Sequence, residues 1–254
     1  RYRGYNNTQQ TPQAGMYGLQ QVRQVIREPS LAAREANRLY HTRLGRRGPS
    51  GGVDIFEEDW DTLVILDACR YDIFARRSLP GRLESRISKG SHTSEFLAAN
   101  FAGRDLPDTV YVTASPQVAN HGGEFAHVEH AWTDGWDDDT DTVLPETMTD
   151  RALAIAEAYP EKRLIVHYMQ PHYPFIGSTG DDLAAQGSFL DGREDRAYPS
   201  AWERLDAGAA DKEQVWDAYE ENLQVALPEV QRLVDGLDGK TVVTSDHGNL
   251  FGER

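Results

Sequence analysis

Four short runs of apolar, β-forming residues recur along the chain and predict strands. They cover residues 62–66, 109–113, 163–169 and 240–244. The first run, TLVIL, lacks the alternating polar positions of a half-exposed strand. Such a run is typical of a strand that is buried on both faces.

Apolar residues at helical spacing occupy segments between these runs. They predict helices over 72–77, 93–101, 145–159 and 202–237. Pro228 should kink or split the last of these helices. Residues 117–141 and the acidic stretch 177–200 predict loops. Strands that alternate with helices predict an α/β fold, in which a largely parallel central sheet is sandwiched between helices.

A chain of 254 residues can form one large domain, or one domain with an appendage. Residues 1–18 are polar and predict a loosely attached tail. Residues 19–44 predict a helix, and GRRGPSGG at 45–52 predicts a linker. We therefore assign 1–52 to an N-terminal tail, helix and linker, and 53–254 to the α/β domain.

Neither a membrane segment nor a signal peptide is visible in the sequence. No run approaches the roughly 18 apolar residues that a membrane span needs. Residues 1–18 contain no apolar signal region. The cellular location is therefore left open, with the cytoplasm favoured over secretion.

The charge balance is strongly acidic. Aspartate and glutamate number 41 against 26 lysines and arginines, a net charge of −15. Such a field repels phosphate backbones and excludes general nucleic-acid binding. Only 4 of the cations are lysines, and the 23 aspartates outnumber the 18 glutamates. This composition predicts a halophilic source, with an ordinary acidic protein as the alternative.

Candidate metal ligands follow three of the predicted strands. Asp67 follows the first strand, His172 the third, and Asp246 and His247 the fourth. Because ligands bind at the carboxyl ends of strands in open α/β sheets, we expect these side chains to converge. Carboxylate and imidazole groups bind zinc or manganese. Taken alone, an aspartate after a strand is more often a helix cap.

Three passages resemble the sulfatase-like branch of the alkaline phosphatase/sulfatase superfamily. They are TLVILDACRYD (62–72), VHYMQPHYPF (166–175) and VVTSDHGNLFGER (242–254). The resemblance implies an alkaline-phosphatase-like fold and a sulfatase-like catalytic domain over 53–254. Asn249 stands where that branch usually has glutamate, and Ala68 where sulfatases often have a second acidic residue. Related enzymes have another histidine soon after the final GE pair, so we expect the C-terminal part of the domain to be missing.

The resemblance also implies a nucleophile at the start of the helix in SKGSHTSEFLAANFAG (88–103). Thr93, ten residues before Gly103, is our candidate. Ser91 and Ser94 are the alternatives, and Thr93 could also be a simple helix cap.

The other site roles follow from the same resemblance. One or two divalent ions (zinc, manganese or calcium) would be bound by Asp67, Thr93, Asp246 and His247. His172 is the candidate for leaving-group protonation or substrate contact, and His167 is a weaker candidate for substrate contact. Arg70 could contact a phosphate oxygen, although a helix-surface arginine is the simpler interpretation.

These residues indicate a metal-dependent hydrolase or transferase of phosphate esters that acts through a covalent phospho-threonine. The substrate would be a small-molecule, glycan or lipid phosphate (or sulfate) ester. Cys69, the single cysteine, lies outside any C-x-P-S-R pattern, which disfavours formylglycine chemistry. The alternatives are a sulfatase without formylglycine and a non-catalytic domain that binds metal and anions. His127 and His130 could also bind a metal if they shared one face of a helix.

Overall fold

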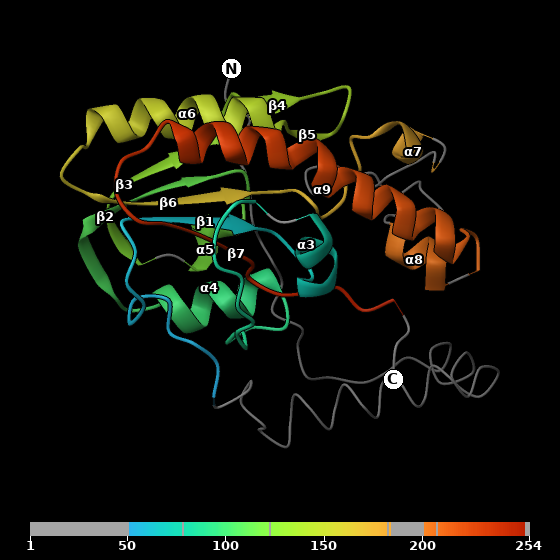
Figure 1. Ribbon diagram of the computed structural model, residues 1–254, viewed down its shortest axis with the longest axis horizontal. Helices are drawn as coiled ribbons and strands as arrows, with labels where there is room; N and C mark the ends of the chain where they lie inside the picture. The colour runs from blue at the N-terminus through green and yellow to red at the C-terminus, as the bar shows by residue number, and fades with distance from the viewer. Residues whose placement is uncertain are drawn as a thin grey trace, which may run out of the picture. The chain divides into compact units, whose positions relative to one another are not determined.

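The computed structural model describes residues 51–77, 79–121, 123–181, 183, 201–206 and 208–251 (Figure 1). The chain divides into two compact units, residues 1–47 and 48–254. The predicted tail and the helix at 19–44 lie outside the described residues, as do most of the linker and most of the acidic stretch at 177–200.

The centre of the second unit is a parallel sheet. Its five strands are β1 (Thr62–Leu66), β2 (Asp105–Thr113), β3 (Glu124–His130), β6 (Arg163–Tyr168) and β7 (Thr241–Thr244), in the order β3-β2-β6-β1-β7. Every neighbouring pair is parallel, and all five residues of β1 are buried. The predicted α/β fold with a parallel sheet between helices is confirmed, and it is consistent with an alkaline-phosphatase-like fold.

Helices cover both faces of this sheet. The helices α6 (Pro145–Ala158) and α9 (Lys212–Asp235) lie on one face, and α4 (Thr93–Phe101) and α5 (Val118–His121) on the other (Figure 1). The side chains of the central strands β1, β2 and β6 alternate between the two cores. Tyr111 and Ile165 pack toward α4, whereas Val112 and Val166 pack toward α6 and α9.

Smaller elements complete the described part of the chain. They are α3 (Tyr71–Arg77), η1 (Ala131–Thr133), β4 (Trp136–Asp137), β5 (Thr142–Val143), α7 (Ser178–Asp181) and α8 (Ala201–Asp206). The strands β4 and β5 form a small antiparallel pair. Each helix in the described part of the chain is either too short or too polar to span a bilayer.

The strand register determines which side chains meet at the edge of the sheet. Ile65 of β1 lies opposite His167 of β6 on one side and opposite Thr244 of β7 on the other. The carboxyl ends of β1, β6 and β7 therefore lie level with one another. This arrangement brings the residues that follow β1 and β7 close to the last residues of β6.

The loops predicted at 117–141 and 177–200 are wrong in part, and the second contains α7 at Ser178–Asp181. The segment 117–141, predicted as a loop, contains the edge strand β3, whose one partner among the described strands is β2. Its polar side chains stay partly exposed, so it lacks the apolar pattern of the central strands. Since His127 and His130 stand three apart on this strand, they point to opposite faces and cannot form the helical metal pair considered above.

The predicted long helix also differs in detail. It is split before Lys212 into α8 and α9, whereas α9 runs unbroken through Pro228. A buried apolar stripe continues on both sides of this proline, from Tyr219 to Leu233. Packing along the whole stripe offsets the loss of about 3 kcal/mol that a proline causes inside a helix.

Helix α9 offers a test of its N-terminal cap. The Asp211 carboxylate accepts hydrogen bonds from the backbone N–H groups of Glu213 and Gln214. We expect Asp211→Ala to lower the free energy of unfolding by about 1 kcal/mol, because these two donors lose their acceptor. Urea denaturation followed by circular dichroism measures the change. The matched control is Asp217→Ala, an exposed aspartate in the same helix; equal losses in the two variants would contradict the capping role.

Candidate active site

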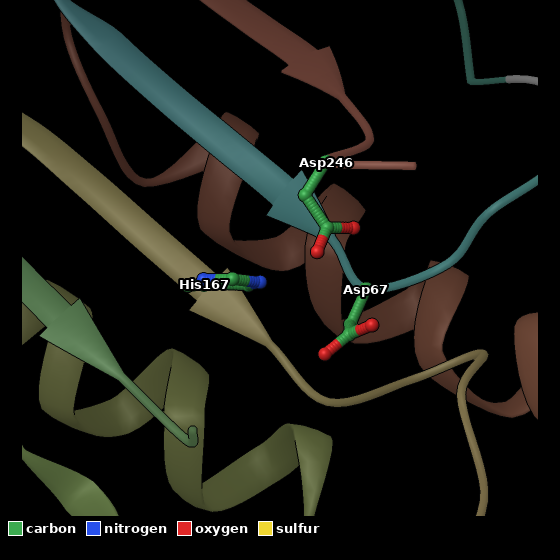
Figure 2. Close-up of side chains that lie close together, drawn as sticks. All are labelled: Asp67, His167 and Asp246. Atoms are coloured by element: carbon green, nitrogen blue, oxygen red, sulfur yellow. The ribbon is translucent and has the colours of Figure 1, made fainter. Parts of the chain in front are cut away.

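Two buried carboxylates and a buried imidazole converge at the carboxyl edge of the sheet. Asp67 follows β1, Asp246 follows β7, and His167 is the penultimate residue of β6 (Figure 2). Their exposed fractions are 2%, 0% and 0%. One potential ligand atom from each residue lies within 4.8 Å of the other two. The predicted convergence of Asp67 and Asp246 is therefore present, and His167 joins them.

Hydrogen bonds to the backbone fix the position of Asp246. Its Oδ1 accepts from the backbone N–H of Ala68 and from that of His247, each at 2.9 Å. The Ala68 backbone has a φ of 59°, a left-handed conformation that is uncommon outside glycine. This conformation lets the turn after β1 donate to the carboxylate that follows β7.

The Thr93 hydroxyl lies beside these groups, at the first residue of α4. Its Oγ1 is 3.4 Å from both carboxylate oxygens of Asp67 and 3.4 Å from Nε2 of His247. The side chain is buried, and the N-cap position belongs to His92, so Thr93 is not the helix cap. At 3.4 Å each contact is longer than a good O–H···O hydrogen bond, so the hydroxyl is close to these groups without being tightly bound.

The two alternative hydroxyls are engaged elsewhere. The Ser91 hydroxyl donates to the Glu95 carboxylate at 2.7 Å. The Ser94 hydroxyl donates to the side-chain oxygen of Gln117. Of the three candidates, Thr93 is the one that contacts Asp67.

The site has more negative than positive side chains. Burial raises the pKa of Asp67, but nearby His172, His247 and His167 lower it below its usual range overall. Burial and the negative charge of Asp67 raise the pKa of Asp246. Among the described residues no lysine or arginine forms an ion pair with either carboxylate; the imidazole of His247 is 3.5 Å from Asp67 and 3.6 Å from Asp246.

His247 responds to both carboxylates. Burial alone would lower its pKa, but the hydrogen bond to Asp67 and the charges of Asp246 and Asp67 raise it to about 9. In the absence of other cations, this imidazole therefore carries a proton at neutral pH and offsets part of the negative charge.

Two buried atoms of the site have no hydrogen-bond partner among the described residues. They are Oδ2 of Asp246 and Nε2 of His167. Leaving buried polar atoms unpaired is unfavourable unless a ligand satisfies them. Carboxylate oxygens and imidazole nitrogens in one small space suit a divalent metal ion. The donor set therefore fits the ion that the sequence predicts.

His172 is placed beside Asp67 by the loop that follows β6. Its backbone N–H donates to the carbonyl of Asp67 at 3.1 Å, and its Nδ1 donates to the carbonyl of Tyr173 at 2.8 Å. The side chain is partly exposed, as a group that meets a substrate would be.

Asn222 of α9, which the sequence did not single out, holds this loop. Its Nδ2 lies within hydrogen-bond distance of the carbonyls of Pro171, His172 and Pro174, and its Oδ1 accepts from the N–H of Ile176. One buried amide thus fixes the backbone on both sides of His172.

Tyr219, one turn earlier on α9, holds the turn after β1 in the same way. Its hydroxyl donates to the carbonyl of Ala68 and accepts from the backbone N–H of Arg70 at 3.1 Å. The sequence does not reveal this role of Tyr219, because the contact of its hydroxyl depends on the tertiary fold.

The side chain of Arg70 has several partners within the protein. Its Nε and Nη2 donate to Asp72, each at 2.9 Å, and its Nη1 donates to the carbonyl of Asn249 at 3.1 Å. The guanidinium also lies 4.9 Å from the ring centre of Trp216. These contacts join the segments after β1 and β7, and a role of Arg70 in substrate contact stays a prediction.

Cys69 is adjacent to the site but is chemically unsuited to act as its nucleophile. The thiol is buried, and burial together with the negative charges of Asp246 and Asp72 raises its pKa. It therefore stays protonated at neutral pH.

Comparisons with protein-family models, with curated proteins and with solved structures gave no significant match for this chain. A function can therefore be inferred from the residues of the site alone.

Asn222 allows a test of how the His172 loop is held. We expect Asn222→Ala to lower the free energy of unfolding by about 3 kcal/mol, because it leaves several buried backbone groups without a partner. Thermal and urea denaturation measure this loss. Gln224→Ala removes an exposed amide two residues along the same helix and should have little effect. A loss below about 1 kcal/mol for Asn222→Ala would show that the loop does not depend on this side chain.

Substitution of Asp246 by asparagine should have opposite effects on the free energy of unfolding with and without metal. In Asp246→Asn the side-chain oxygen can still accept from Ala68 and His247, but the charge next to Asp67 is gone. We expect the metal-free variant to be more stable than the original chain by about 1 kcal/mol, because a buried charge whose pKa is raised opposes folding.

Zinc at about 100 times its dissociation constant should then stabilise the original chain by about 3 kcal/mol and leave the variant unchanged. Urea denaturation in EDTA and in zinc measures both effects. Asp217→Asn, on the exposed side of α9, should respond to zinc as the original chain does. Equal stabilisation of Asp246→Asn by zinc would contradict the assignment of Asp246 as a ligand.

Proposed function

We propose that this chain is a metal-dependent hydrolase or transferase of phosphate esters, related to the sulfatase-like branch of the alkaline phosphatase superfamily. The observation that carries the proposal is the position of Thr93. Its buried hydroxyl is 3.4 Å from the carboxylate of Asp67 and from the imidazole of His247. A hydroxyl buried among metal-binding groups at the carboxyl edge of a parallel sheet suits a nucleophile.

Asp67, Asp246 and His247 would hold the divalent ion. When bound, such an ion lowers the pKa of a neighbouring hydroxyl and offsets negative charge on phosphate oxygens. Zinc and manganese suit this mixture of oxygen and nitrogen donors better than calcium does.

The residues of the chain would carry out a double displacement. Thr93 Oγ1 would release its proton to bulk water and attack phosphorus in line, forming one O–P bond as the bond to the leaving oxygen breaks. His172 would protonate that oxygen, so that an alcohol leaves and a phospho-threonine remains. Attack by water or by an acceptor hydroxyl would then release the phosphoryl group and restore the threonine. Water as the acceptor gives a hydrolase, and a sugar or lipid hydroxyl gives a transferase.

Substitution of Thr93 tests this function. The full chain is incubated in concentrated salt with zinc or manganese and with three esters: p-nitrophenyl phosphate, bis(p-nitrophenyl) phosphate and p-nitrophenyl sulfate. We expect turnover of a phosphate ester to fall about 10³-fold or more in Thr93→Ala, because the nucleophile is removed. Ser94→Ala removes a neighbouring hydroxyl that contacts Gln117 and should keep its activity. Mass spectrometry after an acid quench should find the phosphoryl group on Thr93.

The outcomes separate the alternative functions. Turnover of the sulfate ester alone would replace the proposal with a sulfatase that works without formylglycine. Zinc binding without turnover of any ester would favour a non-catalytic domain that binds metal and anions. Full phosphatase activity in Thr93→Ala would exclude Thr93 as the nucleophile.

A further inference from the structure

His167 has a buried environment that its assignment as a weak substrate contact does not explain. Its ring lies parallel to that of Tyr111, with 6.2 Å between ring centres and 10° between planes. Nδ1 is 2.7 Å from the hydroxyl of Tyr111. Nε2 has no hydrogen-bond partner among the described residues, although the residue is 0% exposed. One nitrogen is therefore held in place, while the other is left without a partner by the part of the chain that the structure describes.

His167 is also directed toward the carboxylates. Its ring projects from the end of β6 toward Asp67 and Asp246 (Figure 2). A potential ligand atom of each residue lies within 4.8 Å of the other two. Ligands on opposite sides of one ion stand about 4–5 Å apart, since each bond measures about 2.0–2.6 Å. The three side chains can therefore share one ion.

The pairing with Tyr111 suits a metal ligand better than an ordinary core histidine. A histidine ligand commonly donates its other ring N–H to a neighbouring group, which fixes the ring and its tautomer. The hydroxyl of Tyr111 is 2.7 Å from Nδ1, and the oxygen of a phenol can accept this N–H. A histidine that only filled the core would keep a buried nitrogen unsatisfied, which is unfavourable.

We propose that His167 is a protein ligand of the divalent ion in the candidate active site, and that Tyr111 is the positioning residue that orients it. This inference rests on the metal centre of the proposed function and extends it. With His247, the site offers two imidazoles and two carboxylates. Two nitrogen donors favour zinc over calcium, which binds almost exclusively to oxygen.

Zinc affinity of the full chain, measured by calorimetry, tests the role of Tyr111. Tyr111→Phe keeps the ring and removes the hydroxyl. The matched control is Tyr168→Phe, because Tyr168 is equally buried and its hydroxyl is 2.7 Å from Thr149, in the core on the other face of the sheet. We expect zinc binding about 10–100-fold weaker in Tyr111→Phe and nearly unchanged in Tyr168→Phe.

X-ray absorption at the zinc edge tests the role of His167 directly. We expect two imidazole ligands in the original chain and one in His167→Gln. If His167→Gln does not fold, calorimetry of Tyr111→Phe decides the question.

The failures of the two proposals are distinguishable. If Asp246→Asn abolishes zinc binding but His167→Gln keeps both the affinity and the two imidazole ligands, the inference is overturned and the metal centre stands. Equal zinc affinities in Tyr111→Phe and Tyr168→Phe would remove the positioning role of Tyr111. If the original chain binds neither zinc nor manganese, both the proposed metal centre and this inference are wrong.

Discussion

The site is organised around two like charges buried next to each other. Asp67 and Asp246 follow neighbouring strands, and no lysine or arginine of the described chain pairs with them. Such a pair opposes folding, because both carboxylates are shielded from bulk solvent. The imidazoles of His167, His172 and His247 all lower the energy of the charged Asp67. The requirement for positive charge therefore explains why histidines gather at this edge and why a dication suits it.

Contacts elsewhere in the fold hold the two aspartates close together. The register of β1, β6 and β7 makes their carboxyl ends level, so the two aspartates cannot move apart without disrupting the sheet. Helix α9 fixes the loops around them, since Tyr219 and Asn222 bond to the turns after β1 and β6. Both residues lie within an otherwise apolar stripe. The packing of one helix thus stabilises the sheet and positions the site at the same time.

The sequence predicts the parts of the site that follow directly from strand order. Asp67, Asp246 and His247 could be found because they come directly after apolar runs, and Thr93 because it begins a helix in a passage with a family resemblance. Asn222 and the hydroxyl of Tyr219 could not, because their contacts exist only once α9 has packed against the loops. His167 could be recognised as a candidate metal ligand only from its contact with Tyr111 on the neighbouring strand, which the spacing of residues in the sequence does not reveal. The strand β3 was missed because an edge strand keeps polar side chains.

The negative charges of the protein affect the binding of an anionic substrate mainly where they lie close to it. A phosphate ester is an anion, and both the net charge of −15 and the two carboxylates would repel it. In about 1 M salt, charges are screened beyond about 3 Å, so the distant surface contributes little. The charges of Asp67 and Asp246 are screened far less, because both side chains are buried. A bound dication would cancel the charge of the two carboxylates there. The cation that relieves the repulsion between Asp67 and Asp246 would therefore also allow an anionic substrate to approach Thr93.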